Sequence, residues 1–303
     1  MKRNYEQLRI SASRRAFTLV EMLVVVSVIA ILAALTLFAV NKVSVSSKIA
    51  KTRTTVQKID VAMQQIFETY EDKFLVFKNK VANDDTTKNL DKETQLRIVL
   101  HYLRDTMRME MPQCWAEVSA DPAAIKLNGK NYDALDKSPL LKYYQNTKPA
   151  GTTPSRSALL FLIIQNLNPE ALEAFHGSEI ADTDGDGLLE FVDAWGRPIQ
   201  FLRWAPAFTD SDLQQNVPWG NAEAARRASE QHPFLLEGQG DIIGWFLYPL
   251  IYSAGPDGVY GINEGDGKWE PGDEIDPYAL PIGKPTGSEH FDNIHNHQRY
   301  RGF

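Results

Sequence analysis

The sequence lacks several features that would point directly to a function. It has a single cysteine, Cys114, so no intrachain disulfide is possible, although an exported protein would be free to use one. It has no Gly-x-Ser-x-Gly motif, no phosphate-binding glycine loop and no His-Glu-x-x-His helix. Its net charge of −7 argues against nucleic acid as a main partner. If the chain is exported and needs a stabilising cross-link, the natural candidate is therefore a metal ion.

Positive charge is scarce outside the first 16 residues. These hold five basic residues and one acidic residue, so residues 17–303 hold 27 basic and 38 acidic residues and a net charge of −11. The length of 303 residues and the 43% hydrophobic content suffice for one large or two small domains. We therefore expect a basic leader over residues 1–16 and a distinctly acidic remainder.

A single long hydrophobic run follows this leader. Residues 17–40 read FTLVEMLVVVSVIAILAALTLFAV, and Glu21 is their only ionisable residue. As a helix this run spans roughly 36 Å, enough to cross a bilayer core of about 30 Å, and the arginines before it favour a cytoplasmic N-terminus. A signal peptide has a shorter apolar region with its small-residue cleavage site behind it, whereas here the small residue, Ala16, comes first. The run predicts a single transmembrane helix.

Glu21 decides whether this helix is a plain anchor. A carboxylate in the membrane costs roughly 2.5–3.5 kcal/mol on insertion scales, and the run has no Lys, Arg or His to pair with it. A cut between Ala16 and Phe17 would create an α-ammonium group able to reach the Glu21 of a neighbouring subunit. One cut would then remove the basic leader and create an attraction between adjacent helices.

The segment RRAFTLVE, residues 14–21, resembles the processing site of type IV prepilins and type II secretion pseudopilins. The resemblance implies that prepilin peptidase cleaves before Phe17 and methylates its new amine, and that Glu21 guides assembly. The sequence departs from the family at Ala16, where Gly is usual. The implied partners are the membrane, other copies and other pseudopilins in a filament, and a secretion assembly platform. The implied location is the inner membrane, crossed once, with a cytoplasmic N-terminus and a periplasmic or extracellular head.

Helical periodicity predicts that this helix continues over residues 41–78 as an amphipathic spine. Apolar residues recur at spacings of three and four, namely Val56, Ile59, Met63, Ile66, Tyr70 and Phe74. The alternative is a break near residues 41–47 and a separate soluble helix. A second amphipathic pattern, ending near Met111, comprises Leu96, Val99, Leu100, Leu103 and Met107.

Residues 79–180 are expected to form a mostly helical insertion, with a buried helix beginning near Ser155 whose apolar run is too short to cross a membrane. Residues 181–303 are expected to form a β-sheet head with acidic loops and strands near 198–204 and 242–253. The predicted fold class is α+β and pilin-like, with a long N-terminal transmembrane and spine helix, a helical insertion and a small C-terminal antiparallel sheet.

Two segments beside the predicted strands resemble the major type II pseudopilin. DAWGRP, residues 193–198, is similar to its Asp-Pro-Trp-Gly signature, and IYSAGPDG, residues 251–258, is similar to its strand-to-loop segment. Together they cover a small part of the chain, and the insertion shows no such likeness.

Residues 182–193 have the D-x-D-x-D-G spacing of a calcium loop. Carboxylates at alternate positions converge on one hard cation, and Gly187 permits the sharp turn. The candidate ligands are the side chains of Asp182, Asp184, Asp186 and Asp193 and the carbonyl of Leu188. An EF-hand has Glu at the twelfth position, and Asp193 is one methylene shorter. The alternative is an Asp/Gly turn with solvated carboxylates.

A second acidic cluster extends over residues 257–276 and holds seven acidic residues. In the major pseudopilin the corresponding loop binds calcium. By that resemblance Asp257 lies close to a site, and the further ligand candidates are Asp266, Asp273 and Asp276. The alternative is an acidic loop without a metal.

The remaining motifs indicate no catalysis. Cys114 is expected to be a packed core thiol, and His290, His295 and His297 are expected in a polar C-terminal tail rather than a metal site. Three functions stay open: a structural pseudopilin of a type II secretion filament, a minor type IV pilus subunit whose insertion binds a ligand, and an enzyme on a pilin-like anchor. The resemblance favours the first.

Overall fold

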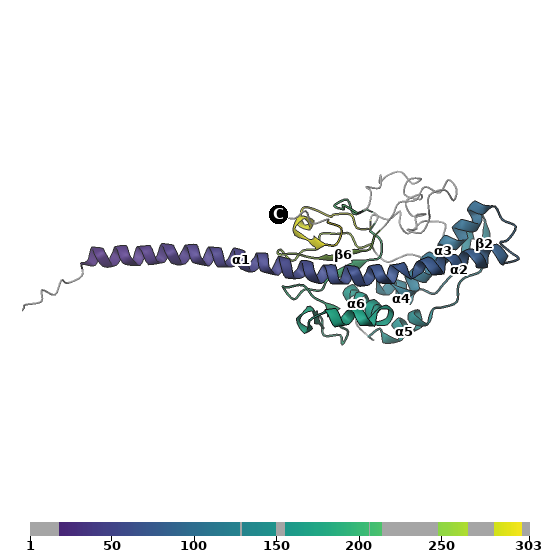
Figure 1. Ribbon diagram of the computed structural model, residues 1–303, viewed down its shortest axis with the longest axis horizontal. Coiled ribbons are helices and arrows are strands. Elements are labelled where there is room, and N and C mark those ends of the chain that lie inside the picture. Colours follow the sequence, from purple (N-terminus) through teal and green to yellow (C-terminus); the bar gives the residue numbers. More distant parts are fainter. Residues whose placement is uncertain are drawn as a thin grey trace, which may run out of the picture. The chain divides into compact units, whose positions relative to one another are not determined.

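The computed structural model describes residues 18–127, 129–149, 155–205, 207–213, 248–265 and 282–298. The chain divides into two units, one ending at Ser47 and the other beginning at Lys48. The described elements are helices and short antiparallel strands (Figure 1). This confirms the predicted α+β class, in an arrangement consistent with a pilin-like fold.

The first helix, α1, runs from Leu19 to Glu68 without interruption. The sequence has neither glycine nor proline between these residues, so nothing in it favours a break. The alternative of a separate soluble helix after residues 41–47 is therefore wrong.

The part of α1 from Leu19 to Val40 carries apolar side chains on all sides. Every large apolar side chain that the structure describes from Leu19 to Val45 is exposed. Within the described residues, the helix that begins at Leu19 is the one long and apolar enough to cross a membrane. A helix hydrophobic all round is stable only in lipid or against other protein, so this segment needs an environment that the single chain does not supply.

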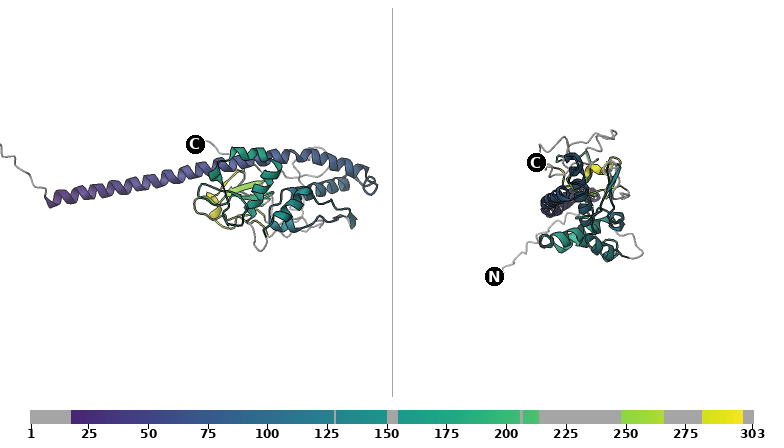
Figure 2. Two further views of the ribbon diagram at one scale, coloured as in Figure 1. Left: turned by 90° about the horizontal axis from the view of Figure 1, so that it is seen from below. Right: turned by 90° about the vertical axis from the view of Figure 1, so that its right-hand side faces the viewer.

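The part of α1 from Lys48 onward has one buried face. The predicted stripe is confirmed, because Val56, Ile59, Met63 and Ile66 are buried, and so are Tyr70 and Phe74 in α2, Tyr70–Asn83. Helix α2 packs beside α3, Lys92–Glu110 (Figure 2). The Asp91 side chain caps α3 by accepting a hydrogen bond of 2.9 Å from Thr94 N.

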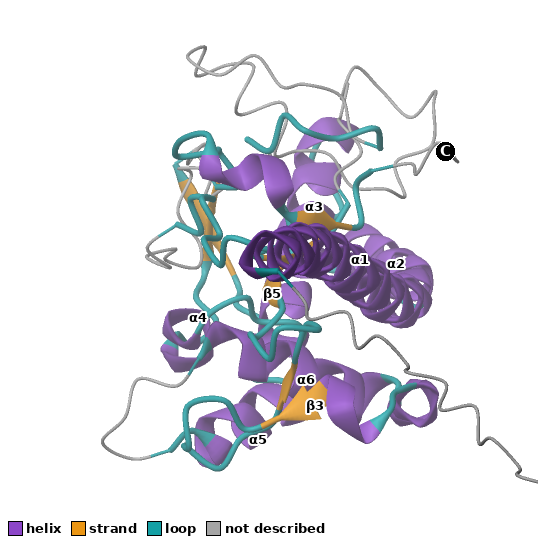
Figure 3. Ribbon diagram, turned by 90° about the vertical axis from the view of Figure 1, so that its left-hand side faces the viewer, coloured by secondary structure: helices purple, strands orange, loops and turns teal. Residues whose placement is uncertain are grey.

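Helix α6, Arg156–Leu167, is the core helix of the insertion. Residues 157–164 are all buried, and the helix packs on β4, Glu190–Phe191, and β5, Gln200–Leu202. Figure 3, which looks along α1, shows α5 and α6 together on one side of that helix. Burial on all sides explains its nearly continuous apolar sequence without a membrane. The 3₁₀ helix η1, Pro169–Ala174, follows it.

The stretch between α3 and α6 has more regular structure than the sequence suggests. Its elements are α4, Trp115–Ser119, the antiparallel pair β1, Ile125–Leu127, and β2, Lys130–Tyr132, and α5, Pro139–Thr147. None exceeds nine residues, so hydrophobic periodicity has too few repeats to reveal them.

The C-terminal sheet has the order β5-β6-β7, with β6, Leu250–Ser253, in the centre and β7, Ile294–His295, at one edge. Both pairings are antiparallel. The 3₁₀ helix η4, Glu289–Asp292, precedes β7. A separate antiparallel pair joins β3, Ile180–Ala181, to β4, and the 3₁₀ helix η2, Gly177–Glu179, leads into it.

The expectation of a polar C-terminal tail for His290, His295 and His297 is wrong. All three side chains are buried, and His295 belongs to β7. Imidazole is tolerated there because it finds partners: His297 Nε2 lies 3.0 Å from the carbonyl of Pro249, and His297 Nδ1 lies 3.0 Å from Ser211 Oγ.

Candidate functional site

The N-terminal assembly segment begins in the structure at Thr18; Ala16 and Phe17 lie outside the described residues. Thr18 N and Thr18 Oγ1 both donate to Glu21 Oε2 at 2.8 Å, and Glu21 N donates to Thr18 Oγ1 at 3.2 Å. This reciprocal pattern is a capping box, which satisfies amides at the start of α1.

The capping box gives Glu21 a partner that sequence reasoning missed. The signal was present, because Thr18 and Glu21 form a Thr-x-x-Glu pattern directly before an apolar run. Glu21 therefore has a local structural role in the single chain in addition to any contact with a neighbouring subunit. An assembly experiment has to separate these two roles.

The DAWGRP segment forms a tight turn organised by Asp193. Asp193 Oδ1 accepts hydrogen bonds from Trp195 N at 2.8 Å and Arg197 N at 3.0 Å, while Asp193 N donates to Arg197 O at 2.8 Å. Gly196 has a φ of 80°, a backbone conformation that glycine adopts at little cost. The turn thus explains both residues of the signature: the aspartate accepts its backbone hydrogen bonds, and the glycine adopts its positive φ.

The turn is tied to the YSAGPDG segment, residues 252–258, which begins in β6 and continues past its end. Ser253 Oγ donates to Asp193 Oδ2 at 2.7 Å, and Arg197 Nη1 donates to the carbonyl of Gly255 at 2.6 Å. A Cβ added at Gly255 would lie 2.1 Å from Asp292 O, so this position requires glycine. The two segments that resemble the major pseudopilin therefore form one hydrogen-bonded unit.

The same turn rests on the buried part of α1. Ala194 N donates to Thr52 Oγ1 at 3.0 Å, and Thr52 is fully buried. The ammonium of Lys48 lies 5.9 Å from the centre of the Trp195 ring, within cation–π distance. These contacts fix the sheet on the spine helix.

The first acidic loop connects β3 to β4. Asp182, Asp184 and Asp186 each offer a carboxylate oxygen, and these oxygens lie within 4.8 Å of one another. Gly187, at the sixth position of the loop, has a φ of 88°, as the sharp turn requires. Burial and the neighbouring Asp184 and Asp182 charges raise the pKa of Asp186, against a hydrogen bond from Leu188.

Asp193 is not part of this group. Both of its oxygens accept hydrogen bonds within the turn and from Ser253, so it is a structural residue. Glu190, at the ninth position of the loop, lies beside the three aspartates without belonging to the group within 4.8 Å, and its Oε2 accepts a hydrogen bond from Thr183 N in the loop at 2.8 Å. Burial, then the charges of Asp184 and Asp186, raise the pKa of Glu190, against hydrogen bonds from Thr183. Sequence reasoning missed Glu190 because it assigned the last ligand by loop length alone.

The second acidic cluster is described only in part. Asp257 Oδ1 accepts a hydrogen bond of 2.8 Å from Val259 N, and Asp257 N donates to Asp292 Oδ2 at 3.1 Å. Asp266, Asp273 and Asp276 lie outside the described residues. The calcium site expected at this cluster stays a prediction.

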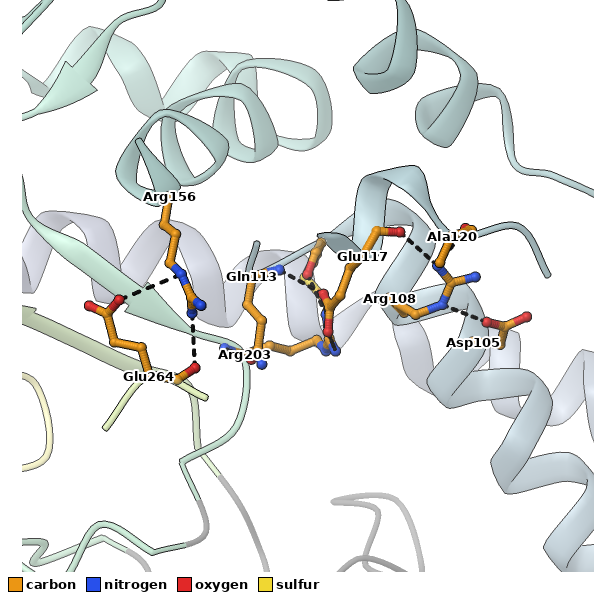
Figure 4. Close-up of polar contacts among 9 residues, drawn as sticks. Asp105, Arg108, Gln113, Glu117, Ala120, Arg156, Arg203 and Glu264 are labelled. Carbon is orange, nitrogen blue, oxygen red and sulfur yellow. Dashed lines mark hydrogen bonds and ion pairs between the residues drawn. The ribbon is translucent and has the colours of Figure 1, made fainter. Parts of the chain in front are cut away.

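A buried polar network joins the insertion to the sheet (Figure 4). Arg203, after β5, donates two hydrogen bonds of 2.9 Å to the two oxygens of Glu117 on α4. Both side chains are almost completely buried. Gln113 N donates to the same carboxylate at 2.8 Å. This bidentate pair is a structural contact, and its partners are too far apart in sequence for a local pattern to predict.

Figure 4 also shows Arg156 and Glu264 beside this pair. Arg156 Nη1 and Nη2 donate to the carbonyls of Glu264 and Gly265, which anchors the segment after β6 to α6. Cys114, next to the network, is a buried free thiol as predicted, and burial followed by the Glu117 charge raises its pKa, which makes it a poor nucleophile.

Comparison with known proteins identifies one family model. Residues 11–37 match the Prokaryotic N-terminal methylation motif. No curated protein and no solved structure matches the chain. The match covers the last six residues of the leader, the expected cleavage position and most of the apolar run. The chain therefore carries a type IV pilin-like prepilin signal, which implies processing by prepilin peptidase and assembly into a filament, and which is typical of structural proteins rather than enzymes.

Proposed function

We propose that this chain is a structural, non-catalytic subunit of a type II secretion pseudopilus, assembled into a filament that helps drive protein export. The prepilin signal supports filament assembly in general. The choice of a pseudopilus rests on the joining of the DAWGRP turn to the YSAGPDG segment through Asp193–Ser253 and Arg197–Gly255. Each of these hydrogen bonds joins a residue of the DAWGRP turn to a residue of the YSAGPDG segment. The two segments therefore stabilise each other, which is a physical reason for both to occur in one protein.

In this proposal the precursor lies in the inner membrane with residues 1–16 in the cytoplasm and the head on the periplasmic or extracellular side. Cleavage before Phe17 releases the leader and frees an α-ammonium group. The exposed apolar face of α1 then packs against other copies and other pseudopilins, and Glu21 pairs with the new terminus of a neighbour. The secretion assembly platform drives the extraction of the helix from lipid.

One observation favours a second candidate, a minor type IV pilus subunit with a ligand-binding insertion. Within residues 79–180 the structure places α3, α4, α5 and α6 and the β1–β2 hairpin, more than a minimal pseudopilin needs. A large insertion on a filament subunit suits recognition of a ligand at the tip or surface of a pilus.

Mass spectrometry of the N-terminus in the native host tests the shared part of both candidates. The expected mature chain begins with N-methylated Phe17, and Ala16→Gly is the matched control because it restores the residue usual in the family. A mature chain that retains the leader, or that begins elsewhere, would refute processing as a prepilin.

Deletion of the gene in the same host separates the two candidates. A pseudopilus subunit is needed for protein release into the medium and not for surface pili, so secretion should fail while pili remain. Loss of pili with normal secretion would contradict the pseudopilus and support the pilus subunit.

A further inference from the structure

We infer that the loop between β3 and β4 binds a calcium ion, held by Asp182, Asp184 and Asp186 and completed by Glu190 rather than Asp193. The loop is distinct from the acidic cluster of residues 257–276. The inference rests on the contacts that residues 179–193 make, and it stands whichever filament the chain forms.

Glu190 carries the inference because its carboxylate is buried and only half satisfied. The residue has 0% exposure and is the first of β4, paired with Ala181. Its Oε2 accepts a hydrogen bond from Thr183 N, which turns the carboxylate into the loop. Its Oε1 is buried and has no hydrogen-bond partner among the described residues. A buried carboxylate oxygen without a donor is costly unless a cation neutralises it.

Asp186 has the same defect. Its Oδ1 accepts a hydrogen bond of 2.8 Å from Leu188 N, while its Oδ2 is buried without a partner. Within the described part of the chain, these are the only two carboxylate oxygens that are buried and unpaired. Asp186 lies in the loop and Glu190 follows it at the start of β4, so one cation bound at the loop would neutralise both carboxylates.

The spacing of the acids suits calcium. Calcium takes oxygen ligands at 2.3–2.6 Å, so two ligands of one ion lie at most about 5 Å apart. The three aspartates each offer an oxygen within 4.8 Å of the others. Backbone amides hold them in place: Gly185 N and Gly187 N donate to the two oxygens of Asp182 at 2.7 and 3.0 Å. The carbonyl of Leu188 is a further oxygen ligand of the kind calcium uses.

Asp193 is excluded because it is buried outside the group of three aspartates, where its carboxylate accepts three hydrogen bonds, two from the turn that precedes β5 and one from Ser253 on β6. The last proposed ligand is therefore Glu190, at the ninth position of the loop and the first residue of β4. Calcium at this point would bridge the loop to β4 and close the β3–β4 hairpin.

The hairpin is in turn linked to the spine helix. Glu179, at the end of η2 directly before β3, accepts hydrogen bonds from Lys58 Nζ at 2.8 Å and Thr55 Oγ1 at 2.5 Å, both on α1. An ion that orders the hairpin would therefore also stabilise this contact with α1. Because the chain can form no intrachain disulfide, a bound ion here would supply a cross-link that a disulfide cannot.

The test is thermal unfolding of the full chain in detergent, in chelator and in millimolar CaCl₂. Wild type should gain about 5 °C in Tm with calcium. Glu190→Gln should lose most of that gain and, in chelator, should melt at or above wild type, because the amide removes an uncompensated buried charge. Glu173→Gln, a change of an exposed acidic residue on η1 outside the loop, should keep the gain. Asp193→Asn should keep the gain as well, although it lowers Tm in both conditions.

Three outcomes would overturn the inference. Calcium could leave the wild-type Tm unchanged. Glu190→Gln could keep the full gain, which would place the ion elsewhere, for instance in the cluster of residues 257–276. Finally, Asp193→Asn could lose the gain while Glu190→Gln keeps it, which would restore the twelfth-position ligand. Isothermal titration of the same variants with calcium alone gives a second readout that does not depend on unfolding.

Discussion

The two parts of α1 differ although they belong to one uninterrupted helix. Up to Val45 the described large apolar side chains are all exposed, whereas from Thr52 to Ile66 one face is buried and the other is mostly polar. The apolar side chains of the first part can be buried only in a membrane or against other copies, whereas those of the buried face of the second part pack within the same chain. Thus the first part should govern assembly, and the second should govern the stability of the head.

The largest expected effect comes from Glu21 in the first part. Glu21→Ala should leave cleavage intact and reduce filament assembly at least tenfold, because it removes both the charge that pairs with a neighbour and the capping-box acceptor. Glu21→Gln removes the charge but keeps a side chain able to accept from Thr18 N. The measurement is the fraction of processed subunit in purified filaments.

The comparison between these variants distinguishes pairing from capping. If charge pairing is decisive, Glu21→Gln should assemble as poorly as Glu21→Ala, and Thr18→Val, which removes only the hydroxyl, should assemble nearly as well as wild type. Normal assembly of Glu21→Gln would show that the local cap is the role of this residue and that the pairing argument is wrong.

The sequence predicted the helices well because their patterns are long. The stripe from Val56 to Phe74 repeats over several turns, and burial follows it closely. The prepilin signal was also readable, since it is a local pattern with a specific chemistry. The short elements of residues 112–149 were not predictable in this way. The segment of β7 was mistaken for a polar tail, because a strand of two residues is too short to show a hydrophobic periodicity.

The contacts of the acidic loop were beyond sequence reasoning for a different reason. Asp193 and Glu190 are both acidic and both near the end of the loop, and spacing alone favours the former. Only the fold shows that Ser253, distant in sequence, already donates to Asp193 while Glu190 faces Thr183. Choosing between them requires knowledge of a tertiary partner.

A matched pair of alanine substitutions tests the contrast between the two parts directly. Met63→Ala, at a fully buried position, should lower the free energy of unfolding of the head by about 2–5 kcal/mol through lost packing and a cavity. Leu32→Ala, at an exposed position, should change it by less than about 0.5 kcal/mol. Alanine is the best helix former, so neither change disrupts α1 itself.

The measurement is denaturant unfolding of the full chain in detergent, followed by tryptophan fluorescence, with filament assembly measured in parallel. Leu32→Ala is expected to weaken assembly without affecting unfolding. Equal destabilisation by the two variants would mean that the first part of α1 packs within its own chain, and the contrast would be lost.

The last comparison concerns pH, and its effect should be confined to the head, because residues 19–47 contain no histidine. Burial lowers the pKa of His297 to about 4, and burial followed by the nearby Arg104 and Arg97 charges lowers the pKa of His101 to about 4. Unfolding returns both to about 6.5. Between pH 6.5 and 4 the unfolded state therefore binds more protons, so stability is complete above pH 6.5 and falls as the pH decreases towards 4.

Each histidine contributes at most about 3 kcal/mol over this range, and denaturant unfolding at a series of pH values measures the sum. His297→Gln should reduce the slope of the free energy of unfolding against pH, by the equivalent of up to one bound proton below pH 6.5. Above pH 7 the slope should be unchanged, because a neutral imidazole does not titrate there. His297 Nε2 faces the carbonyl of Pro249, and Gln offers an amide donor in its place. An unchanged slope in this variant would mean that His297 is not held neutral by burial, and that the C-terminal segment packs less tightly than β7 and its contacts indicate.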